Sequence, residues 1–346
     1  MKTLRDFKLQ NKRVLVRTDF NVPLDDLGEI LDDFRIKATL PTIKYLMENG
    51  AKIILMSHLG RPEGKVVEKW KMTPVQDRLM EYLDLSIIKA LDCVGSEIEK
   101  WTRQMSPGEI LLLENLRFHK EEEDNDDAFV ADLAKLGDIY VNDAFGASHR
   151  AHASIVGVPK YLPCAAGFLL EKEIEVLGKI MKNPKKPLVA IVGGAKVETK
   201  TELINKISEI AEFVLVGGLI NREIEEKRVR LRYPHKILAP VDEMDEGKDI
   251  GPETIKLFKE KINLAETIFW NGPLGRIEKE EFARGTKEIA KAITESKAFS
   301  VAGGGETVDL INKLGLIEKF NHVSTGGGAM LEFMSGGKLP GIEALK

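Results

Sequence analysis

The chain has 346 residues, of which 43% are hydrophobic and 31% charged, and its formal net charge is −4. At about 100–200 residues per domain this length predicts two domains, and the apolar content suffices for buried cores. The composition excludes a disordered chain and a disulfide-stabilised miniprotein, and the mild negative charge argues against nucleic acid or an anionic membrane as a partner. Apolar runs are too short for a membrane span, and the first residues lack the apolar stretch of a signal peptide, so we expect a cytoplasmic protein.

The two cysteines, Cys93 and Cys164, lie in neither a C-x-x-C motif nor a Cys/His ligand pattern. Isolated thiols are typical of a reducing compartment, and we expect both to be structural. The six histidines are not gathered at ligand spacing, so the sequence predicts no zinc site. The acidic stretch 121–127 is interpreted as a solvated loop leading into a helix rather than as a metal site.

Short apolar runs alternate with helix-like segments along the chain. The runs have the length of strands, and their near-continuous apolarity is typical of parallel strands buried on both faces. In chain order they are 14–16, 53–56, 110–113, 139–141, 188–192, 213–216, 237–239, 267–270 and 299–302. Helices are expected at 35–49, 74–82, 128–136, 200–209, 252–261 and 282–295. This alternation predicts an α/β fold.

One amphipathic segment, 167–182, is predicted to form a single helix that ends at Asn183-Pro184. A βα series lies on each side of it. We therefore interpret it as the connector between the two domains.

The residues that follow the apolar runs are the candidates for a site, because ligands bind beyond the carboxyl ends of the strands in open α/β sheets. In the first half these are arginines, histidines, Asp and Asn. Arginine binds carboxylate and phosphate oxygens through paired N–H groups, so the grouping predicts a site for a small, highly anionic, hydroxylated metabolite. A single arginine or histidine at such a place is more often structural, and only the grouping favours a site.

In the second half glycines stand before helix starts. Glycine lets a phosphate approach backbone N–H groups, and a helix N-terminus adds a partial positive charge, although a Gly-Gly pair also suits a plain tight turn. Lys196 and Lys200 lie one turn apart at such a start. The Walker P-loop, the G-x-G-x-x-G fingerprint and the G-x-S-x-G elbow are all missing from the sequence, which disfavours those three classes.

Eight motifs together resemble the phosphoglycerate kinase family, in the family's order and almost from end to end. They are RVLVRTDFNVPLDD (13–26), SHLGRP (57–62), LLLENLRFHKEEE (111–123), VNDAFGASHRAHAS (141–154), VGGAKVETK (192–200), FWNGPLG (269–275), GGGET (303–307) and HVSTGGGAMLEF (322–333).

The resemblance implies two Rossmann-like domains, each a mostly parallel sheet covered by helices, joined by a hinge helix. It assigns residues 1–166 plus 331–346 to a phosphoglycerate-binding domain, 167–183 to the hinge and 184–330 to a nucleotide-binding domain. It implies a monomer that transfers a phosphoryl group reversibly from 1,3-bisphosphoglycerate to ADP by hinge closure, giving 3-phosphoglycerate and ATP. The expected cofactor is Mg²⁺ carried with ADP or ATP, and the expected partners are these small molecules alone.

The resemblance also implies site residues. The acid-substrate site comprises Asp19, Asn21, Arg35, His58, Arg61, Arg117 and Arg150, with His149 and His152 nearby. The nucleotide site comprises Gly193, Gly194, Lys196, Lys200, Gly217, Gly218, Asn271, Pro273, Glu278, Gly303, Gly304, Gly305, Glu306, Thr307 and Gly326. Stabilisation of the phosphoryl group in flight falls to Arg35, Lys200, Gly304 and Gly327, and approach to the metal falls to Glu306.

The second half departs from the family pattern. The segments 218–240 and 241–249 are several dozen residues shorter than usual. Glu306 and Thr199 stand where the family usually has Asp, and Lys248 stands where an apolar residue lines the adenine pocket. Lysine replaces a flat apolar contact only by laying its stem along the base. We therefore expect intact phosphate recognition and relaxed purine recognition.

Two alternatives stay open at this point. The chain could be a catalytically weak relative that binds phosphoglycerate and recognises nucleotide poorly. A kinase for another small acid is disfavoured by the retained Asp19, Asn21 and arginine set.

Overall fold

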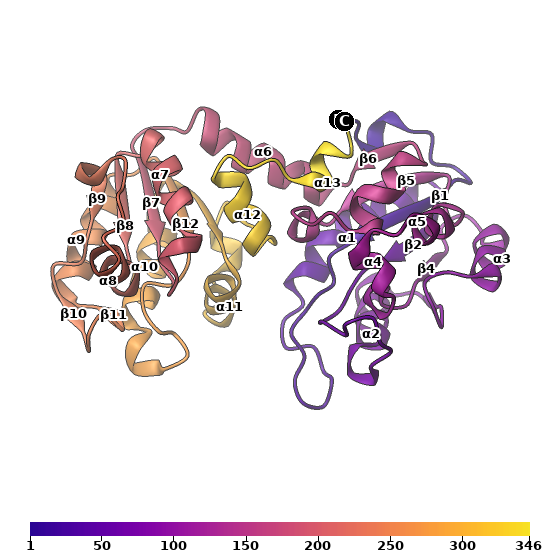
Figure 1. The fold of residues 1–346 in the computed structure, drawn as a ribbon, viewed down its shortest axis with the longest axis horizontal. Helices are drawn as coiled ribbons and strands as arrows, with labels where there is room; N and C mark the ends of the chain where they lie inside the picture. Colours follow the sequence, from indigo (N-terminus) through magenta and orange to yellow (C-terminus); the bar gives the residue numbers. More distant parts are fainter. The chain divides into compact units, whose positions relative to one another are not determined.

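The computed structural model describes residues 1–346 and divides into two compact units, Met1–Ile174 with Lys338–Lys346, and Glu175–Gly337. Each unit contains one six-stranded parallel sheet with helices against it (Figure 1). The expected α/β class with two mostly parallel sheets is confirmed. None of the helices combines the length and the apolarity that a membrane crossing needs.

The sheet of the first unit has the order β3-β4-β2-β1-β5-β6. Its strands are β1 (Arg13–Thr18), β2 (Lys52–Met56), β3 (Ile88–Lys89), β4 (Ile110–Leu112), β5 (Ile139–Asp143) and β6 (Cys164–Ala166). Its helices are α1 (Phe34–Glu48), α2 (Thr73–Leu83), α3 (Ser96–Gln104), α4 (Lys120–Asp124), α5 (Asp127–Ala134) and, near the C-terminus, α13 (Pro340–Glu343). The division between the units falls within α6 (Phe168–Lys182).

The central strand of this sheet, β1, pairs in parallel with β2 and β5, so that Val14 lies opposite Ile53 on one side and Ile139 on the other. Val14, Leu15 and Val16 are all fully buried. Three consecutive buried side chains require cover on both faces of the strand, because neighbouring side chains point to opposite faces. This is the reason that the apolar runs do not alternate.

The sheet of the second unit has the order β14-β13-β12-β7-β8-β9. Its strands are β7 (Leu188–Val192), β8 (Phe213–Val216), β9 (Ile237–Leu238), β12 (Thr267–Asn271), β13 (Phe299–Gly303) and β14 (His322–Val323), and β10 (Glu243–Met244) and β11 (Asp249–Ile250) form a separate antiparallel pair. Its helices are α7 (Thr201–Ile210), α8 (Gly218–Glu226), α9 (Pro252–Asn263), α10 (Arg284–Glu295), α11 (Gly305–Lys313) and α12 (Gly327–Met334).

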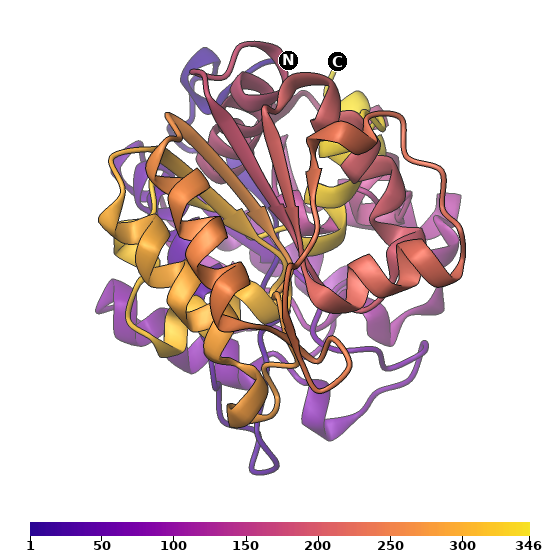
Figure 2. The same ribbon diagram turned by 90° about the vertical axis from the view of Figure 1, so that its left-hand side faces the viewer.

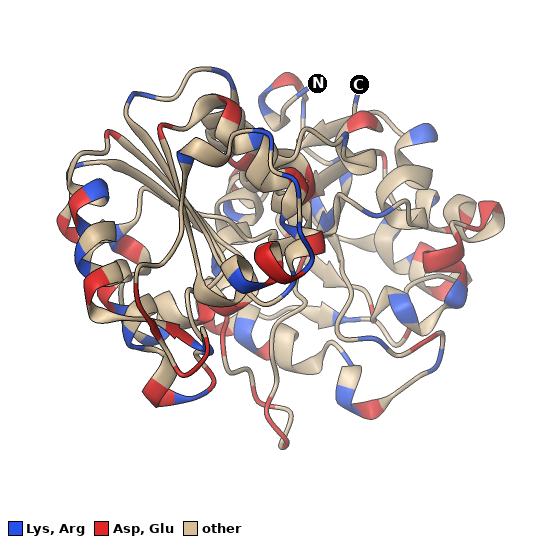
Figure 3. Ribbon diagram, turned by 60° about the vertical axis from the view of Figure 1, so that its left-hand side comes forward, with Lys and Arg blue, Asp and Glu red and all other residues tan.

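Figure 2 faces this second unit and shows helices on both sides of its central strands. In Figure 3 these strands are tan, while the blue and red segments lie on the surrounding helices and loops. A sheet covered on both faces offers no solvated position for a charge, which explains the pattern.

All nine apolar runs predicted as strands coincide with strands. The strands that the sequence did not predict, among them the edge strands β3, β6 and β14, are only two or three residues long. Such short pieces leave no apolar run to recognise. The predicted connector helix is α6, which begins one residue after Gly167.

The acidic stretch 121–127 differs from the expectation of a solvated loop. It forms most of α4 and the start of α5, and Glu122 is fully buried. Ser154 donates to both Glu122 oxygens, from Oγ at 2.6 Å and from its backbone N–H at 2.9 Å. One residue of an acidic run can face inward when a helix turns it toward such donors, which composition alone does not reveal.

The start of α6 is held by a buried carboxylate at the end of β5. Asp143 Oδ1 accepts hydrogen bonds from the backbone N–H groups of Leu169 (2.9 Å) and Leu170 (3.3 Å). Gly167 has no room for a side chain, because a Cβ there would lie 2.2 Å from Asp143 Oδ1. Burial raises the pKa of Asp143 to about 7. The C-terminal residues pack against the same unit, since Gly341 donates its N–H to the Ser148 carbonyl at 2.8 Å.

Candidate active site

Both sheets have a point where the strand order reverses. In the first sheet, β2 lies on one side of β1 and β5 lies on the other side. In the second sheet, β8 and β12 flank β7 in the same way. Ligands in open α/β sheets bind beyond the strand ends at such reversals. The candidate sites are therefore the loops after β1 and β5 in the first unit, and those after β7 and β12 in the second.

In the first unit, Asp19 directly follows β1 and Arg35 lies in the first turn of α1. Arg35 Nη1 lies 3.0 Å from Asp19 Oδ2 and donates to the Asn21 carbonyl at 3.3 Å. Asn21 Oδ1 accepts the backbone N–H of Gly60 at 2.8 Å. The structure thus brings three of the predicted residues together, and the two partners of Arg35 fix its guanidinium.

Arg117 is buried, and only some of its guanidinium N–H groups have hydrogen-bond partners. Its Nη1 donates to the Gly60 carbonyl at 3.0 Å, and its Nε lies 3.2 Å from Glu123 Oε1 without hydrogen-bond geometry. Its Nη2 is buried and has no hydrogen-bond partner. Burial, and then the positive charge of Arg150, lower the pKa of Arg117 to about 10. A buried donor without an acceptor is costly, by about 1–3 kcal/mol, and an anionic ligand would remove that cost.

Two histidines lie among these arginines. Burial, followed by the charge of Arg17 and then of Arg117, holds the pKa of His58 well below its usual range. Burial and the same two arginines lower the pKa of His152 to about 3. Arg17 Nη2 lies 3.2 Å from His58 Nδ1. Because arginine only donates, Nδ1 accepts and the proton of the neutral ring is on Nε2. His58 is thus a neutral hydrogen-bond donor.

Sequence reasoning missed the support beneath this site. Arg17 is fully buried in β1, donates from Nε to Ser154 Oγ at 2.7 Å and lies 3.9 Å from Glu122 Oε1. Burial raises the pKa of Glu122, while Arg17 opposes that rise. The available signal was an arginine directly after the apolar run Val14–Val16, since a buried arginine needs a buried partner.

The charge balance defines what the first unit can bind. Four arginines surround His58, and three carboxylates are paired with them. The arginines are Arg17, Arg35, Arg117 and Arg150, and the carboxylates are Asp19, Glu122 and Glu123. Arg61 is exposed and makes no ion pair. The uncompensated positive charge, together with the neutral donor His58, suits a phosphorylated acid.

In the second unit, the glycines that follow β7 and β8 make hydrogen bonds within the fold. Gly193 donates its N–H to the Asn271 carbonyl at 3.0 Å, Gly194 to Pro273 at 2.8 Å and Gly217 to Val192 at 3.1 Å. A Cβ on Gly193 would lie 1.9 Å from the Pro273 carbonyl oxygen. The backbone N–H groups of these three glycines are thus used within the fold, as expected of the tight-turn interpretation that the sequence left open for such glycine pairs.

Lys200 is the buried cation of this unit. It is 9% exposed, and its Nζ donates to Asn271 Oδ1 at the end of β12. Burial lowers the pKa of Lys200 to about 8, and the negative charge of Glu306 works in the opposite direction. Asn271 Nδ2 is buried and has no partner. A buried cation and an unpartnered donor at the reversal between β7 and β12 are groups whose burial an anionic ligand would compensate.

The starts of α11 and α12 lie side by side. A Cβ on Gly327 would be 3.7 Å from the backbone N of Gly305 and 3.9 Å from Gly304 Cα. Gly304 has φ of +100°, and a Cβ there would lie 3.4 Å from Asn271 Nδ2. First-turn N–H groups have no acceptor inside their own helix, so two helix termini aim donors and partial positive charge at one region.

The other predicted nucleotide residues are spread around this core. Thr307 Oγ1 accepts the N–H of Gly272 at 3.1 Å, so it shapes the loop after β12. Lys196, Glu278 and Glu306 are exposed. The remaining predicted positions lie as follows: Gly303 closes β13, Gly218 opens α8 and Gly326 is the N-cap of α12.

The small β10–β11 pair and its turn pack on the start of α8. A Cβ on Gly218 would lie 2.7 Å from the Gly247 carbonyl oxygen. Lys248 Nζ pairs with Asp245 Oδ2 at 2.7 Å and lies 5.7 Å from the centre of the Phe282 ring. Lys248 is therefore held beside an aromatic ring.

One α/β unit carries a buried arginine-rich site, and the other carries a buried lysine beside two helix N-termini. These features are typical of proteins that bind phosphorylated metabolites on two separate units. The comparisons agree. The phosphoglycerate kinase family model matches residues 4–227 and 223–337. The chain is 46% identical to the phosphoglycerate kinase of Moorella thermoacetica, over 99% of this chain and 98% of that protein. The chain belongs to the phosphoglycerate kinase family.

Solved structures agree with this assignment. A phosphoglycerate kinase from Pyrococcus horikoshii OT3 matches with a TM-score of 0.89 and 35% identity, over 100% of this chain and 98% of that one. One from Coxiella burnetii matches with a TM-score of 0.83 and 34% identity, over 99% and 98%.

The comparisons also locate a shortage of residues. The alignment to the Moorella thermoacetica protein spans 388 positions, 42 more than the 346 residues of this chain. The family model matches in two pieces that meet at residues 223–227, in the second half of α8. The interruption of the family match therefore lies in the second unit, at the end of α8.

Proposed function

We propose that this chain catalyses reversible phosphoryl transfer from 1,3-bisphosphoglycerate to ADP, giving 3-phosphoglycerate and ATP. The observation that carries the proposal is the pairing of Lys200 with Asn271 beside two convergent helix N-termini, in a chain that also keeps the buried arginine site. The full-length likeness to phosphoglycerate kinases favours this reading over a protein that merely binds phosphoglycerate.

We assign binding of the acid substrate to the first unit. Arg117 and Arg150 neutralise its phosphate, and the neutral His58 donates a hydrogen bond without adding charge. Asp19 and Asn21 fix Arg35 and orient it toward the reacting carboxyl group. Rigid placement of a cation costs nothing further when charge develops in the transition state.

We assign the nucleotide phosphates to the second unit. Lys200 and the N–H groups that open α11 and α12 compensate charge on the transferred phosphoryl group, which needs positioning and charge more than covalent help. Glu306, an exposed carboxylate in the first turn of α11, suits the hard oxygen chemistry of Mg²⁺. Magnesium bound with the nucleotide supplies further neutralisation of phosphate charge. Because the substrates bind to different units, transfer requires the units to close and exclude water.

A coupled assay of ATP formation tests the proposal. The full chain should turn over, and Arg35→Ala and Lys200→Ala should each lower kcat by about 10²-fold or more. Lys196→Ala is a matched lysine control and should affect chiefly the KM for nucleotide. Absence of turnover by the wild type, together with calorimetric binding of 3-phosphoglycerate, would contradict the proposal and restore the binding-only alternative.

We further propose that the shortened second unit has relaxed base recognition. Lys248 holds the place beside Phe282, and the family match is interrupted in α8. The test is steady-state kinetics with ADP and GDP, and we expect kcat/KM values that agree within about tenfold. A preference for ADP well beyond that ratio would refute this part alone. We also propose that the chain works as a cytoplasmic monomer, which mass measurement in solution and fractionation would check.

A further inference from the structure

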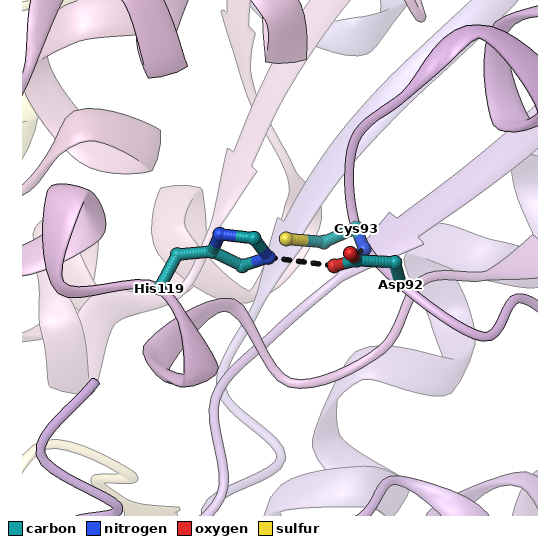
Figure 4. Close-up of side chains that lie close together, drawn as sticks. All are labelled: Asp92, Cys93 and His119. Atoms are coloured by element: carbon teal, nitrogen blue, oxygen red, sulfur yellow. Dashed lines mark hydrogen bonds and ion pairs between the residues drawn. The ribbon is translucent and has the colours of Figure 1, made fainter. Parts of the chain in front are cut away.

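The region between β3 and α3 carries a side-chain cluster that the proposed reaction does not use. Asp92 and Cys93 lie in the loop after β3, and His119 lies between the 3₁₀ turn Leu116–Phe118 and α4. One ligand atom of each residue lies within 4.8 Å of the other two. Figure 4 shows the imidazole edge, the sulfur and the carboxylate facing one another.

The groups of this cluster are already held in place. His119 Nε2 lies 2.6 Å from Asp92 Oδ1, and the His119 ring stacks on Phe129 with centroids 5.2 Å apart. Asp92 Oδ1 also accepts the backbone N–H of Cys93 at 2.7 Å. The Cys93 thiol also hydrogen-bonds to the Asp92 carboxylate, so the carboxylate contacts both other members of the cluster.

We propose that Asp92, Cys93 and His119 form a binding site for a zinc-class divalent cation, with water as the fourth ligand. A thiolate, an imidazole and a carboxylate are the ligand types that Zn²⁺ takes, and thiolate excludes a preference for Mg²⁺ or Ca²⁺. The thiolate and the carboxylate together neutralise a divalent ion, while the imidazole binds as a neutral ligand.

The geometry needs only a small adjustment. Ligand atoms at about 2.0–2.3 Å from a tetrahedral zinc lie roughly 3.3–3.7 Å from one another. The Asp92–His119 contact at 2.6 Å must open slightly, and the other separations, all within 4.8 Å, must close by at most about 1 Å. Entry is possible from solvent, because the side chains of Asp92 and His119 are 53% and 29% exposed, whereas Cys93 forms the buried floor.

A cation here would join the loops that follow β3 and β4, which are neighbours in the sheet. The second loop carries Arg117 two residues before His119. The site is therefore structural in kind, and it acts on the anion site only through the position of that loop. Sequence spacing gave no warning, because His119 is 26 residues from Cys93 and the sheet alone brings them together.

The test is a Co²⁺ titration of the full chain after treatment with a chelator, with ultraviolet and visible absorption as the readout. Cobalt bound by a thiolate gives a sulfur-to-metal charge-transfer band, and we expect that band at one equivalent of metal. It should vanish in Cys93→Ser and persist in Cys164→Ser, the matched control at the other cysteine. Competition with Zn²⁺ should bleach it, and Zn²⁺ should raise the Tm of the wild type but not of Cys93→Ser.

Variants of the two more exposed ligands test the site even if substitution of the buried cysteine disturbs folding. Asp92→Asn and His119→Gln, checked for folding by circular dichroism, should each weaken Co²⁺ binding by more than about tenfold, since even residues that only support a ligand cost that much. A wild-type titration without the band, or a band that survives in His119→Gln with unchanged affinity, would overturn the proposal. Neither result would bear on the kinase activity, which is assayed separately.

Discussion

Replacement of Lys200 by methionine should lower activity and raise stability together. The Lys200 ammonium is buried beside Asn271, and burial lowers its pKa from 10.5 to about 8. At about 1.4 kcal/mol per pKa unit, keeping this charge at pH 7 costs the folded state on the order of 3 kcal/mol. Methionine has a similar length and no charge, but it leaves Asn271 Oδ1 without its donor, which costs about 1–2 kcal/mol. We expect a net gain of about 1–2 kcal/mol in the free energy of unfolding.

The pH dependence gives the prediction its sign. The folded-state pKa of Lys200 lies below that of the unfolded chain, so the unfolded state binds more protons between about pH 8 and 10.5. Stability from this group therefore rises with pH across that window. The wild type should gain up to about 3 kcal/mol more than Lys200→Met over the same range.

Urea unfolding followed by fluorescence measures this difference. Trp270 is the only tryptophan of the second unit and is fully buried, so a Trp70→Phe/Trp101→Phe background reports unfolding of that unit. Exposed Lys196→Met serves as the control and should change little. Equal pH slopes in the wild type and Lys200→Met would refute the reasoning, because they would show that burial does not perturb this lysine.

Three further predictions concern the two sites. Arg35→Ala should lower kcat by about 10²-fold or more, while exposed Arg61→Ala should act chiefly on the KM for 3-phosphoglycerate, and steady-state kinetics distinguishes the two. Gly193→Ala should destabilise the second unit by more than about 2 kcal/mol, because its Cβ would lie 1.9 Å from a carbonyl oxygen. Gly178→Ala is the control: its Cβ would meet no atom within 4 Å, so this variant should be neutral or stabilising. Urea unfolding measures both. His152 has a pKa of about 3 in the folded state and near 6.5 in the unfolded state, so its contribution to stability is present above pH 6.5 and is lost as the pH falls. In His152→Gln the midpoint of urea unfolding should therefore fall less steeply over that pH range. An unchanged slope would contradict this prediction.

The sequence by itself determined the fold class, the family and most of the strands. Runs such as Leu188–Val192 are apolar at every position, and only a strand buried on both faces accepts that pattern. Short edge strands such as β14 were not predicted, because two residues hold no periodicity. Long motifs carried the family, since their order along the chain is itself a sequence property.

Tertiary structure alone decided how the site residues work. It showed that the N–H groups of Gly193 and Gly194 bond to carbonyl groups at and just after the end of β12, 78 and 79 residues away. It placed Glu122 beneath Arg17, and His119 beside Cys93, across separations that no local pattern encodes. Parallel strands bring their carboxyl ends to one edge whatever their distance in the chain, and that edge is where this protein gathers its chemistry.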